Sequence, residues 1–201
     1  MNTLMKSAGG ITQVSADSRL LAKRIVFLEG MIDANRAGEF VRQILILNQE
    51  SMDKPIRVLI NSMGGEISAG MMIYDAIQGS KAPIEIYCVG CAYSMAAVIM
   101  ACSRHGRYIL PHGELMLHEP MLGERVGGNS TSIRSISEGL MEMKGRINRI
   151  LAKHTGRSKE EIEQATRYDH FLSAKESVEF GLCDAISGFD KLLEQSGDMS
   201  R

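Results

Sequence analysis

Residues 84–102, IEIYCVGCAYSMAAVIMAC, join a strand-like segment to a helix-like segment through a short turn. Ile84–Val89 is rich in β-branched and apolar residues, and Met95–Cys102 is an apolar run that favours a helix. Ser94 ends the turn between them, in a row of small residues. Ser94 is therefore either a buried hydroxyl that packs the two elements together or a nucleophile at a strand-to-helix turn.

The same alternation of strands and helices continues on both sides of this segment. Because strands joined by helices form right-handed crossovers, the pattern predicts an α/β fold with a largely parallel sheet. Functional groups of such folds gather where strands end and helices begin, and two of these turns contain glycine, 62–66 (SMGGE) and 90–95 (GCAYSM). The other predicted strands are 24–30, 56–60, 107–110 and 114–118, and the other predicted helices are 35–48 and 68–78.

The C-terminal half contains one long amphipathic helix. Over residues 132–153 the apolar positions advance by threes and fours. A helix with a single apolar stripe needs a surface to cover, and that surface could belong to another subunit. Two shorter helices follow, each introduced by a capping box, Ser158 with Glu161 and Ser173 with Glu176.

The length of 201 residues suits one domain. We expect a mobile, polar N-terminal segment at 1–17, the folded domain at 18–190 and a flexible C-terminal tail at 191–201. The net charge of −1 predicts neither a nucleic-acid partner nor an anionic membrane surface as a partner. No apolar run is long enough to span a bilayer and the N-terminus lacks the apolar core of a signal peptide, so we expect a cytoplasmic protein.

The sulfur-containing residues give weaker signals. Cys88 and Cys91 form a CxxC, but no second pair of zinc ligands follows, so we expect buried thiols and no metal site. Fourteen methionines without a tryptophan indicate an adaptable, methionine-rich core or groove.

A nucleophilic Ser94 needs a base, and His118 is the best placed of the five histidines. It ends the predicted strand 114–118 and precedes Glu119-Pro120, although a structural role there is about as plausible. His154 instead closes the long helix, where a positive imidazole would favour the C-terminal dipole. The remaining histidines lie among polar and turn residues.

A carboxylate should orient the base, and Asp169 is the candidate. It lies in the short link 167–171 between two capped helices, where aspartate is more often a turn or cap residue. Ser94, His118 and Asp169 would together form a serine–histidine–aspartate relay. The backbone N–H groups of Met95 and Gly65 could stabilise an oxyanion, although the glycine pair is equally consistent with a tight turn.

Several segments resemble the proteolytic subunit of the Clp proteases, a family of self-compartmentalised serine peptidases. The resemblance runs from about Ser18 to Ile186 and implies the superhelical fold of repeated ββα units shared with crotonases, with a protruding handle at 123–154. It implies catalytic roles for Ser94, His118 and Asp169, oxyanion amides at Gly65 and Met95, and no cofactor. The segments are SRLLAKRIVFLEG, INSMGGEISAGMMIYDAI, GCAYSMAA, LMLHEP, KGRINRILAKHTG and YDHFLSAKESVEFGLCDAI.

The resemblance also implies an assembly and partners. In this family, two heptameric rings joined by their handles form a tetradecamer that encloses the active sites, and a hexameric AAA+ unfoldase delivers unfolded proteins. The chain departs from the pattern at Met63, where the family has proline, and at Tyr168, where it commonly has arginine. The aromatic anchors of the outer docking pocket align with Arg57, Leu59 and Gly79, so we expect weakened docking of the unfoldase and possible mixed rings with a paralogue.

Two alternatives remain at this point. The chain could be a regulatory or weakly active ring subunit with a misaligned triad. It could also be an acyl-CoA hydratase-like enzyme of the same superfold, although a complete triad argues against that reading.

Overall fold

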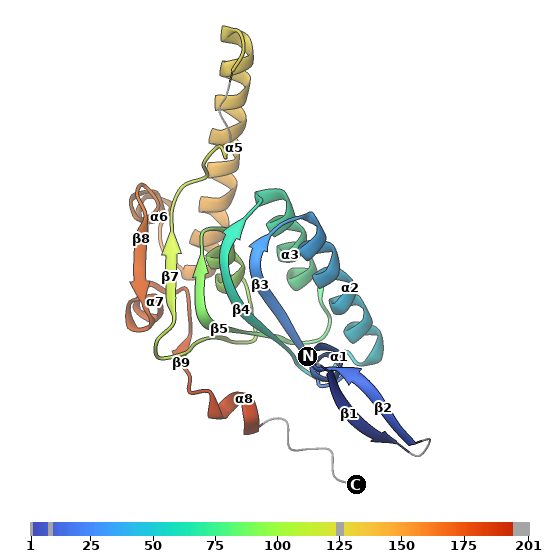
Figure 1. Cartoon of the computed structure of the whole chain (residues 1–201). Helices are drawn as coiled ribbons and strands as arrows, with labels where there is room; N and C mark the ends of the chain where they lie inside the picture. The colour runs from blue at the N-terminus through green and yellow to red at the C-terminus, as the bar shows by residue number, and fades with distance from the viewer. Residues whose placement is uncertain (1, 8–9, 124–126, 195–201) are drawn as a thin grey trace.

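The structure is a computed structural model that describes residues 2–7, 10–123 and 127–194. It consists of an α/β head from which one long helix projects (Figure 1). Within the described residues, no helix has the length and apolar character needed to cross a membrane. The elements are β1 (Asn2–Ser7), β2 (Gly10–Ser15), α1 (Ala16–Leu21), β3 (Ile25–Ile32), α2 (Ala34–Glu50), β4 (Ile56–Gly65), α3 (Ile67–Gly79), β5 (Ile84–Tyr93), α4 (Met95–Ala101), β6 (Arg107–Ile109), β7 (Glu114–Leu117), α5 (Ser130–Thr155), α6 (Lys159–Ala165), β8 (His170–Ser173), α7 (Ala174–Phe180), β9 (Ala185–Ile186) and α8 (Asp190–Glu194).

The central sheet has the order β3-β4-β5-β6-β9, and β7 pairs with both β5 and β8. Strand β5 forks: its first half pairs with β6 and its second half, Cys91–Tyr93, pairs with β7. All of these pairs are parallel except β7–β8, which is antiparallel. The predicted α/β fold with a largely parallel sheet is confirmed.

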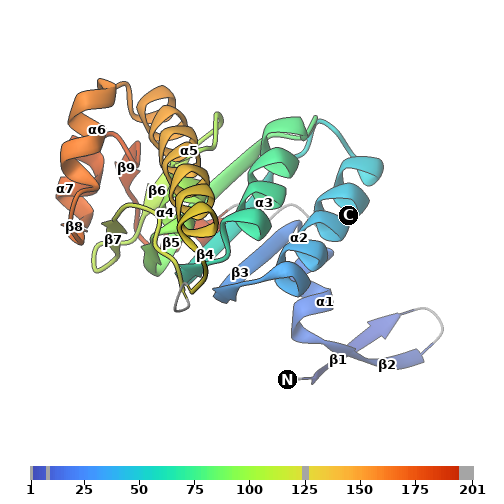
Figure 2. The same cartoon turned by 90° about the horizontal axis from the view of Figure 1, so that it is seen from above.

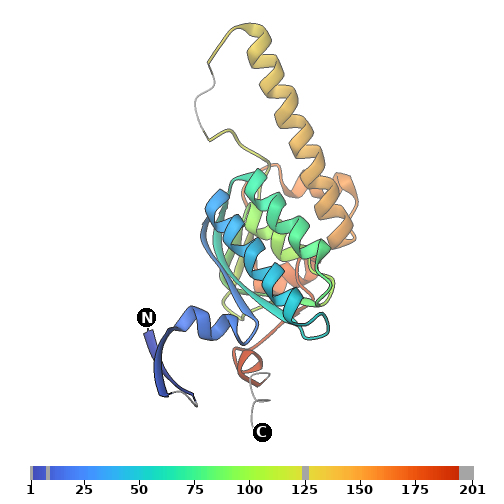
Figure 3. The same cartoon turned by 90° about the vertical axis from the view of Figure 1, so that its right-hand side faces the viewer.

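Helices α2 and α3 lie side by side over one face of this sheet (Figures 2 and 3). Helix α4 is buried along its whole length, which explains why its sequence is an uninterrupted apolar run rather than an amphipathic one. The main core joins these three helices to the sheet residues beneath them. The head is therefore built around the helix that begins immediately after Ser94.

Strands β4 and β5 continue several residues beyond their predicted ends at Ile60 and Val89. A bulge shifts their register between Ile60 and Ser62, and the side chain of Asn61 accepts a hydrogen bond from the Cys91 amide at 3.3 Å. Gly90 allows this close approach, because a Cβ there would lie 2.6 Å from the Asn61 amide oxygen. The bulge carries both glycine-containing turns to the same edge of the sheet.

The projecting helix is α5, and its predicted span of 132–153 is extended by two residues at each end. Asn129 caps its start and Gly156, with a φ of 75°, ends it. Only Ile147, Asn148 and Leu151 near its base are buried, whereas large apolar residues farther out, Ile133, Ile136 and Met141, stay exposed. Within the predicted handle at 123–154, residues 124–126 lie outside the described residues.

The two ends of the chain differ from expectation. Strands β1 and β2 form an antiparallel hairpin in the stretch 1–17, for which the sequence predicted no regular element, and α1 begins at its end and continues to Leu21. Helix α8 contains the predicted start of the tail at residue 191, and the rest of that tail, 195–201, lies outside the described residues. The hairpin and α8 lie at the opposite end of the head from α5 (Figures 1 and 3).

Candidate active site

Ser94 occupies a strained turn at the end of β5. Its φ of 55° and ψ of −121° fall in a region that residues with a Cβ rarely adopt. Its amide donates a hydrogen bond to the Met116 carbonyl at 2.8 Å, and Gly64 lies directly behind it. A Cβ at Gly64 would come within 2.9 Å of the Ser94 Cβ, so the turn needs glycine at that place. This packing holds a half-buried serine at the carboxyl end of the sheet.

His118 follows β7 and lies beside Ser94. Because β7 runs parallel to the second half of β5, with Tyr93 opposite Met116, both strands deliver their next residues to the same edge. The Nε2 atom of His118 lies 2.7 Å from the Ser94 hydroxyl oxygen. The hydroxyl can donate to Nε2 when the imidazole proton is on Nδ1. The structure thus brings together the serine and the histidine that the sequence singled out.

Asp169 approaches His118 from the other side. Strands β7 and β8 are antiparallel with Leu117 opposite His170, so one further step in that register places His118 opposite Asp169. The Asp169 carboxylate lies 3.3 Å from His118 Nδ1, but the pair lacks hydrogen-bond geometry and the Asp169 side chain is 62 % exposed. Strand β8 was not predicted, because its four residues, HFLS, form too short a pattern to indicate a strand.

Gly65 and Met95, the two candidate oxyanion residues, belong to turns that touch each other. A Cβ at Gly64 would lie 3.2 Å from the Met95 nitrogen, which shows how closely the glycine turn approaches the start of α4. Gly65 itself has a φ of 155°, and a Cβ there would lie 2.2 Å from the Ile32 carbonyl oxygen. Only glycine fits this place, and the groove beside Ser94 is lined by Gly65.

A profile of the Clp protease family matches residues 8–189. The chain belongs to the Clp protease family. This membership confirms the resemblance and the fold, and it supports a peptidase, which is a hydrolase of protein substrates, in an oligomeric assembly. It also favours the peptidase over the acyl-CoA hydratase alternative.

Two cavities of this Clp protease adjoin Ser94 and His118. The larger is a groove of about 680 Å³ whose walls include Gly65, Ser94 and His118. The smaller, of about 20 Å³, lies against the same serine and histidine and is otherwise apolar. Its other lining residues are Ile67, Met95, Val98, Leu117, Pro120, Ile147 and Leu151.

Polar contacts tie the strands of the site to each other and to the base of α5. The Tyr93 hydroxyl on β5 donates to the Glu114 carboxylate on β7, and this hydrogen bond raises the pKa of Tyr93 to about 12. Glu119, next to His118, forms an ion pair with Lys144 on α5. The loop that carries His118 is therefore held between the sheet and the projecting helix.

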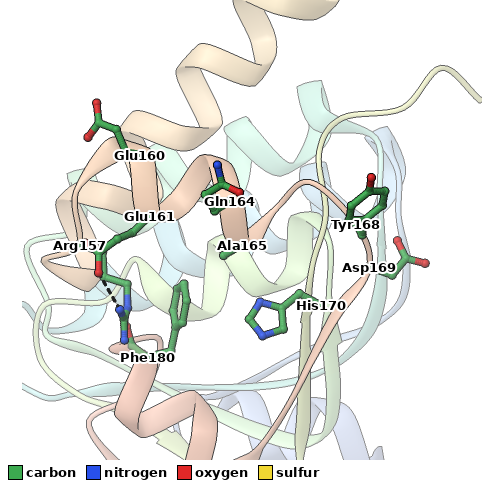
Figure 4. A pocket seen from close by; sticks show the side chains of 9 residues that line it. All are labelled: Arg157, Glu160, Glu161, Gln164, Ala165, Tyr168, Asp169, His170 and Phe180. Atoms are coloured by element: carbon green, nitrogen blue, oxygen red, sulfur yellow. Dashed lines mark hydrogen bonds and ion pairs between the residues drawn. The ribbon is translucent and has the colours of Figure 1, made fainter.

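A separate hollow of about 690 Å³ lies next to Asp169 (Figure 4). Tyr168 and Asp169 stand at one end of it, and Arg157, paired with Glu161 at 3.0 Å, stands at the other. The Arg157 guanidinium lies 4.2 Å from the centre of the Phe180 ring. Neither Ser94 nor His118 lines this hollow. It borders the site at Asp169, whose side chain is exposed to solvent.

The described part of the chain contains no group of three histidine, cysteine, aspartate or glutamate side chains suited to a metal ion. Burial raises the pKa of the Cys88 and Cys102 thiols to about 12, so they are protonated at neutral pH. These two cysteines are packing residues in the core.

Proposed function

We propose that this chain is a serine endopeptidase subunit in which Ser94 is the nucleophile, His118 the general base and Asp169 the residue that orients the base. The observation that carries the proposal is the 2.7 Å contact between the Ser94 hydroxyl and His118 Nε2, on a strained strand-to-helix turn. The 3.3 Å approach of Asp169 to Nδ1 supports the third role.

In the first half of the reaction, Ser94 Oγ attacks the peptide carbonyl carbon while its proton passes to His118 Nε2. The amides of Gly65 and Met95 stabilise the negative oxygen that develops on the substrate. Collapse of this intermediate breaks the C–N bond, and Nε2 returns the proton to the leaving amine. A water molecule then gives a proton to Nε2, attacks the acyl carbon and releases the second product, so that Ser94 regains its proton.

The two cavities suggest how a polypeptide binds. The groove of about 680 Å³ would bind an extended segment through its backbone, which gives broad specificity. The small cavity, lined by Val98, Ile147 and Leu151 among others, has a volume of about 20 Å³, so next to the cleaved bond it favours an apolar group of about methyl size.

The proposed assembly is a pair of heptameric rings, a tetradecamer, that acts in the cytoplasm on unfolded proteins supplied by a hexameric AAA+ unfoldase. The exposed apolar residues of α5 support self-association through this helix. Docking of the unfoldase should be weak in a homomer, because Arg57 is buried and donates to the Leu192 carbonyl at 3.1 Å. Helix α8 thus covers the sheet surface around Leu59, and mixed rings with a paralogue would supply a different dock.

Labelling of Ser94 by a fluorophosphonate tests the catalytic proposal. We expect a label on the wild-type protein that maps to Ser94 and is absent from Ser94→Ala. Hydrolysis of an unfolded protein by the same sample, with internal cuts, tests the endopeptidase step. An assembled particle that takes no label would instead support the regulatory ring subunit, a reading favoured by the exposed Asp169 and its imperfect contact with Nδ1.

A further inference from the structure

The groove beside Ser94 is lined by an unusual number of methionines. They come from five separate segments: the end of β3, the end of β4, strand β7, the chain after Pro120, and α5. They are Met31, Met63, Met116, Met121 and Met143. No sequence motif joins them, and only the fold brings them to one surface.

The strand pairing explains part of this convergence. Met31 is opposite Gly64 in the β3–β4 register, and Met63 precedes Gly64 on β4, so both lie at the ends of these paired strands. The Met116 carbonyl accepts the hydrogen bond from the Ser94 amide at 2.8 Å, which fixes this residue beside the turn. Met143 precedes Lys144, whose ion pair with Glu119 holds the base of α5 over the groove. The methionines and the proposed nucleophile therefore share one cavity.

Four of the five side chains are exposed to solvent, and Met143, at 37 %, is the least exposed of the four. Met31, Met63 and Met121 are 65 %, 60 % and 68 % exposed. Several exposed apolar side chains around one groove indicate a binding surface. Methionine suits such a surface because its unbranched chain has three rotatable bonds and its sulfur is polarisable, so it adapts to side chains of different shape.

We propose that these methionines form an adaptable apolar subsite, separate from the small cavity beside Ser94, that binds bulky apolar side chains of an extended polypeptide. Oxidation of the exposed sulfurs of this subsite by a hydroperoxide switches the binding off. The proposal rests on the proposed function, because it assigns the groove to a polypeptide substrate. We assign a polypeptide to this subsite because the same groove is also lined by Ser94 and His118.

The oxidation step is a two-electron transfer. A thioether sulfur attacks the terminal oxygen of the hydroperoxide, the O–O bond breaks, a sulfoxide forms, and the leaving oxygen departs as water or an alcohol after it takes up a proton. The sulfoxide is polar, so the subsite loses its affinity for apolar side chains, and a methionine sulfoxide reductase can restore the thioether.

The exposed sulfurs should react before the other sulfur atoms at the site. Met95, at the start of α4, is 3 % exposed and is shielded from a dissolved oxidant. Cys91 Sγ lies 3.9 Å from Met63 Sδ, but burial raises the pKa of its thiol and keeps it in the less reactive protonated form. Oxidation should therefore alter the groove and leave the Ser94 turn intact.

Binding of a fluorescent, unstructured peptide rich in leucine and phenylalanine tests the proposal. The full-length protein carries Ser94→Ala, which prevents turnover, and Cys91→Ser, which removes the thiol as a competing target. Anisotropy gives the Kd before and after treatment with hydrogen peroxide, and mass spectrometry locates the sulfoxides. We expect the Kd to rise about tenfold after oxidation, and to recover after treatment with the reductase.

The matched control adds Met31→Leu, Met63→Leu, Met121→Leu and Met143→Leu, which keep the groove apolar but cannot be oxidised at these positions. Each protein is compared with its own untreated sample, and the Kd of the control should change by less than about twofold. Equal weakening in the control, unchanged binding by a protein with confirmed sulfoxides, or no peptide binding at all would overturn the subsite. By contrast, a protein that retains Ser94 and binds the peptide in a peroxide-sensitive way, but never cleaves it, would refute only the proposed serine peptidase function.

Discussion

The two contacts of His118 differ in how firmly the chain holds them. On one side, Ser94 is delivered by the parallel pair β5–β7 and backed by Gly64, and its hydroxyl lies 2.7 Å from Nε2. On the other side, Asp169 precedes the four-residue strand β8, stays 62 % exposed and lies 3.3 Å from Nδ1 without hydrogen-bond geometry. The proposed nucleophile and base are held in place by the core, whereas the proposed orienting carboxylate lies at an exposed edge of the sheet.

The largest expected effect tests the firmly held side. His118→Ala removes the side chain that is placed to accept the Ser94 proton, so peptidase activity should fall about 10⁴-fold or more. Measurement of kcat/KM on an unfolded-protein substrate checks this, with far-ultraviolet circular dichroism as the control for folding. Activity within tenfold of wild type would break the assignment of the base.

The second prediction tests the exposed side. Asp169→Asn should lower kcat/KM by only about 10²-fold, because a solvated carboxylate contributes less to the imidazolium than a buried one does. The measurement is the same assay on the same assembled protein. If Asp169→Asn were as inactive as His118→Ala, the carboxylate would have to be held tightly in the working particle, and the contrast between the two sides would vanish.

Arg107 links the elements that support the Ser94 side and the Asp169 side of the site. Its Nη1 atom donates to the carbonyl of Gly181, after the helix that follows β8, at 2.8 Å, and to the carbonyl of Ala101, at the end of α4, at 3.3 Å. Arg107→Ala should therefore lower the free energy of unfolding by about 2 kcal/mol. Urea unfolding measures this, and Arg104→Ala, which loses only an exposed hydrogen bond to Gln78, is the matched control with a much smaller expected loss.

The strain at Ser94 predicts a smaller change in the free energy of unfolding, and this change is an increase. Ser94→Gly relieves the positive φ, whereas Ser94→Ala keeps it, so the glycine variant should be more stable than the alanine variant by about 1 kcal/mol although both are inactive. Thermal unfolding of the two variants side by side provides the comparison. Equal stability would mean that the turn stores no strain.

The smallest expected effect concerns the base of α5. Burial lowers the pKa of His154 to about 4, from an ordinary value of 6.5. The unfolded chain then binds more protons than the folded one between these values, so the contribution of neutral His154 to stability is complete above pH 6.5 and is lost as the pH falls towards 4. Urea midpoints at pH 7 and pH 5 should differ less in His154→Gln, which can still contact the Tyr74 hydroxyl. An unchanged pH dependence in this variant would count against the buried, neutral imidazole.

His154 also shows where local reasoning was wrong. Its position at the end of a long helix predicted a positive imidazole that favours the dipole. In the structure its Nε2 lies 3.1 Å from the Tyr74 hydroxyl, and Arg107 supplies the positive charge, since its Nη1 donates to the His154 carbonyl at 3.0 Å. Desolvation by packed neighbours lowers the pKa of His154 more than the helix dipole raises it. Tyr74 and Arg107 are both far from His154 in sequence.

The sequence by itself determined most of the central elements and the chemistry available to them. Periodicity marked α5, the capping boxes at Ser158 and Ser173 marked α6 and α7, and both boxes are complete in the structure. Ser94 and His118 were recognisable because each stands where a predicted strand ends. These signals are local, since they depend on side chains within a turn or two of one another.

Only the tertiary structure decided which of these residues meet. The fork of β5 places β7 beside Ser94, the antiparallel register of β8 places Asp169 opposite His118, and five segments bring their methionines to one groove. Strand register depends on packing between residues far apart in the chain, and no local pattern carries that information. The sequence therefore identifies the candidate catalytic residues, while packing of the head determines the distances between them.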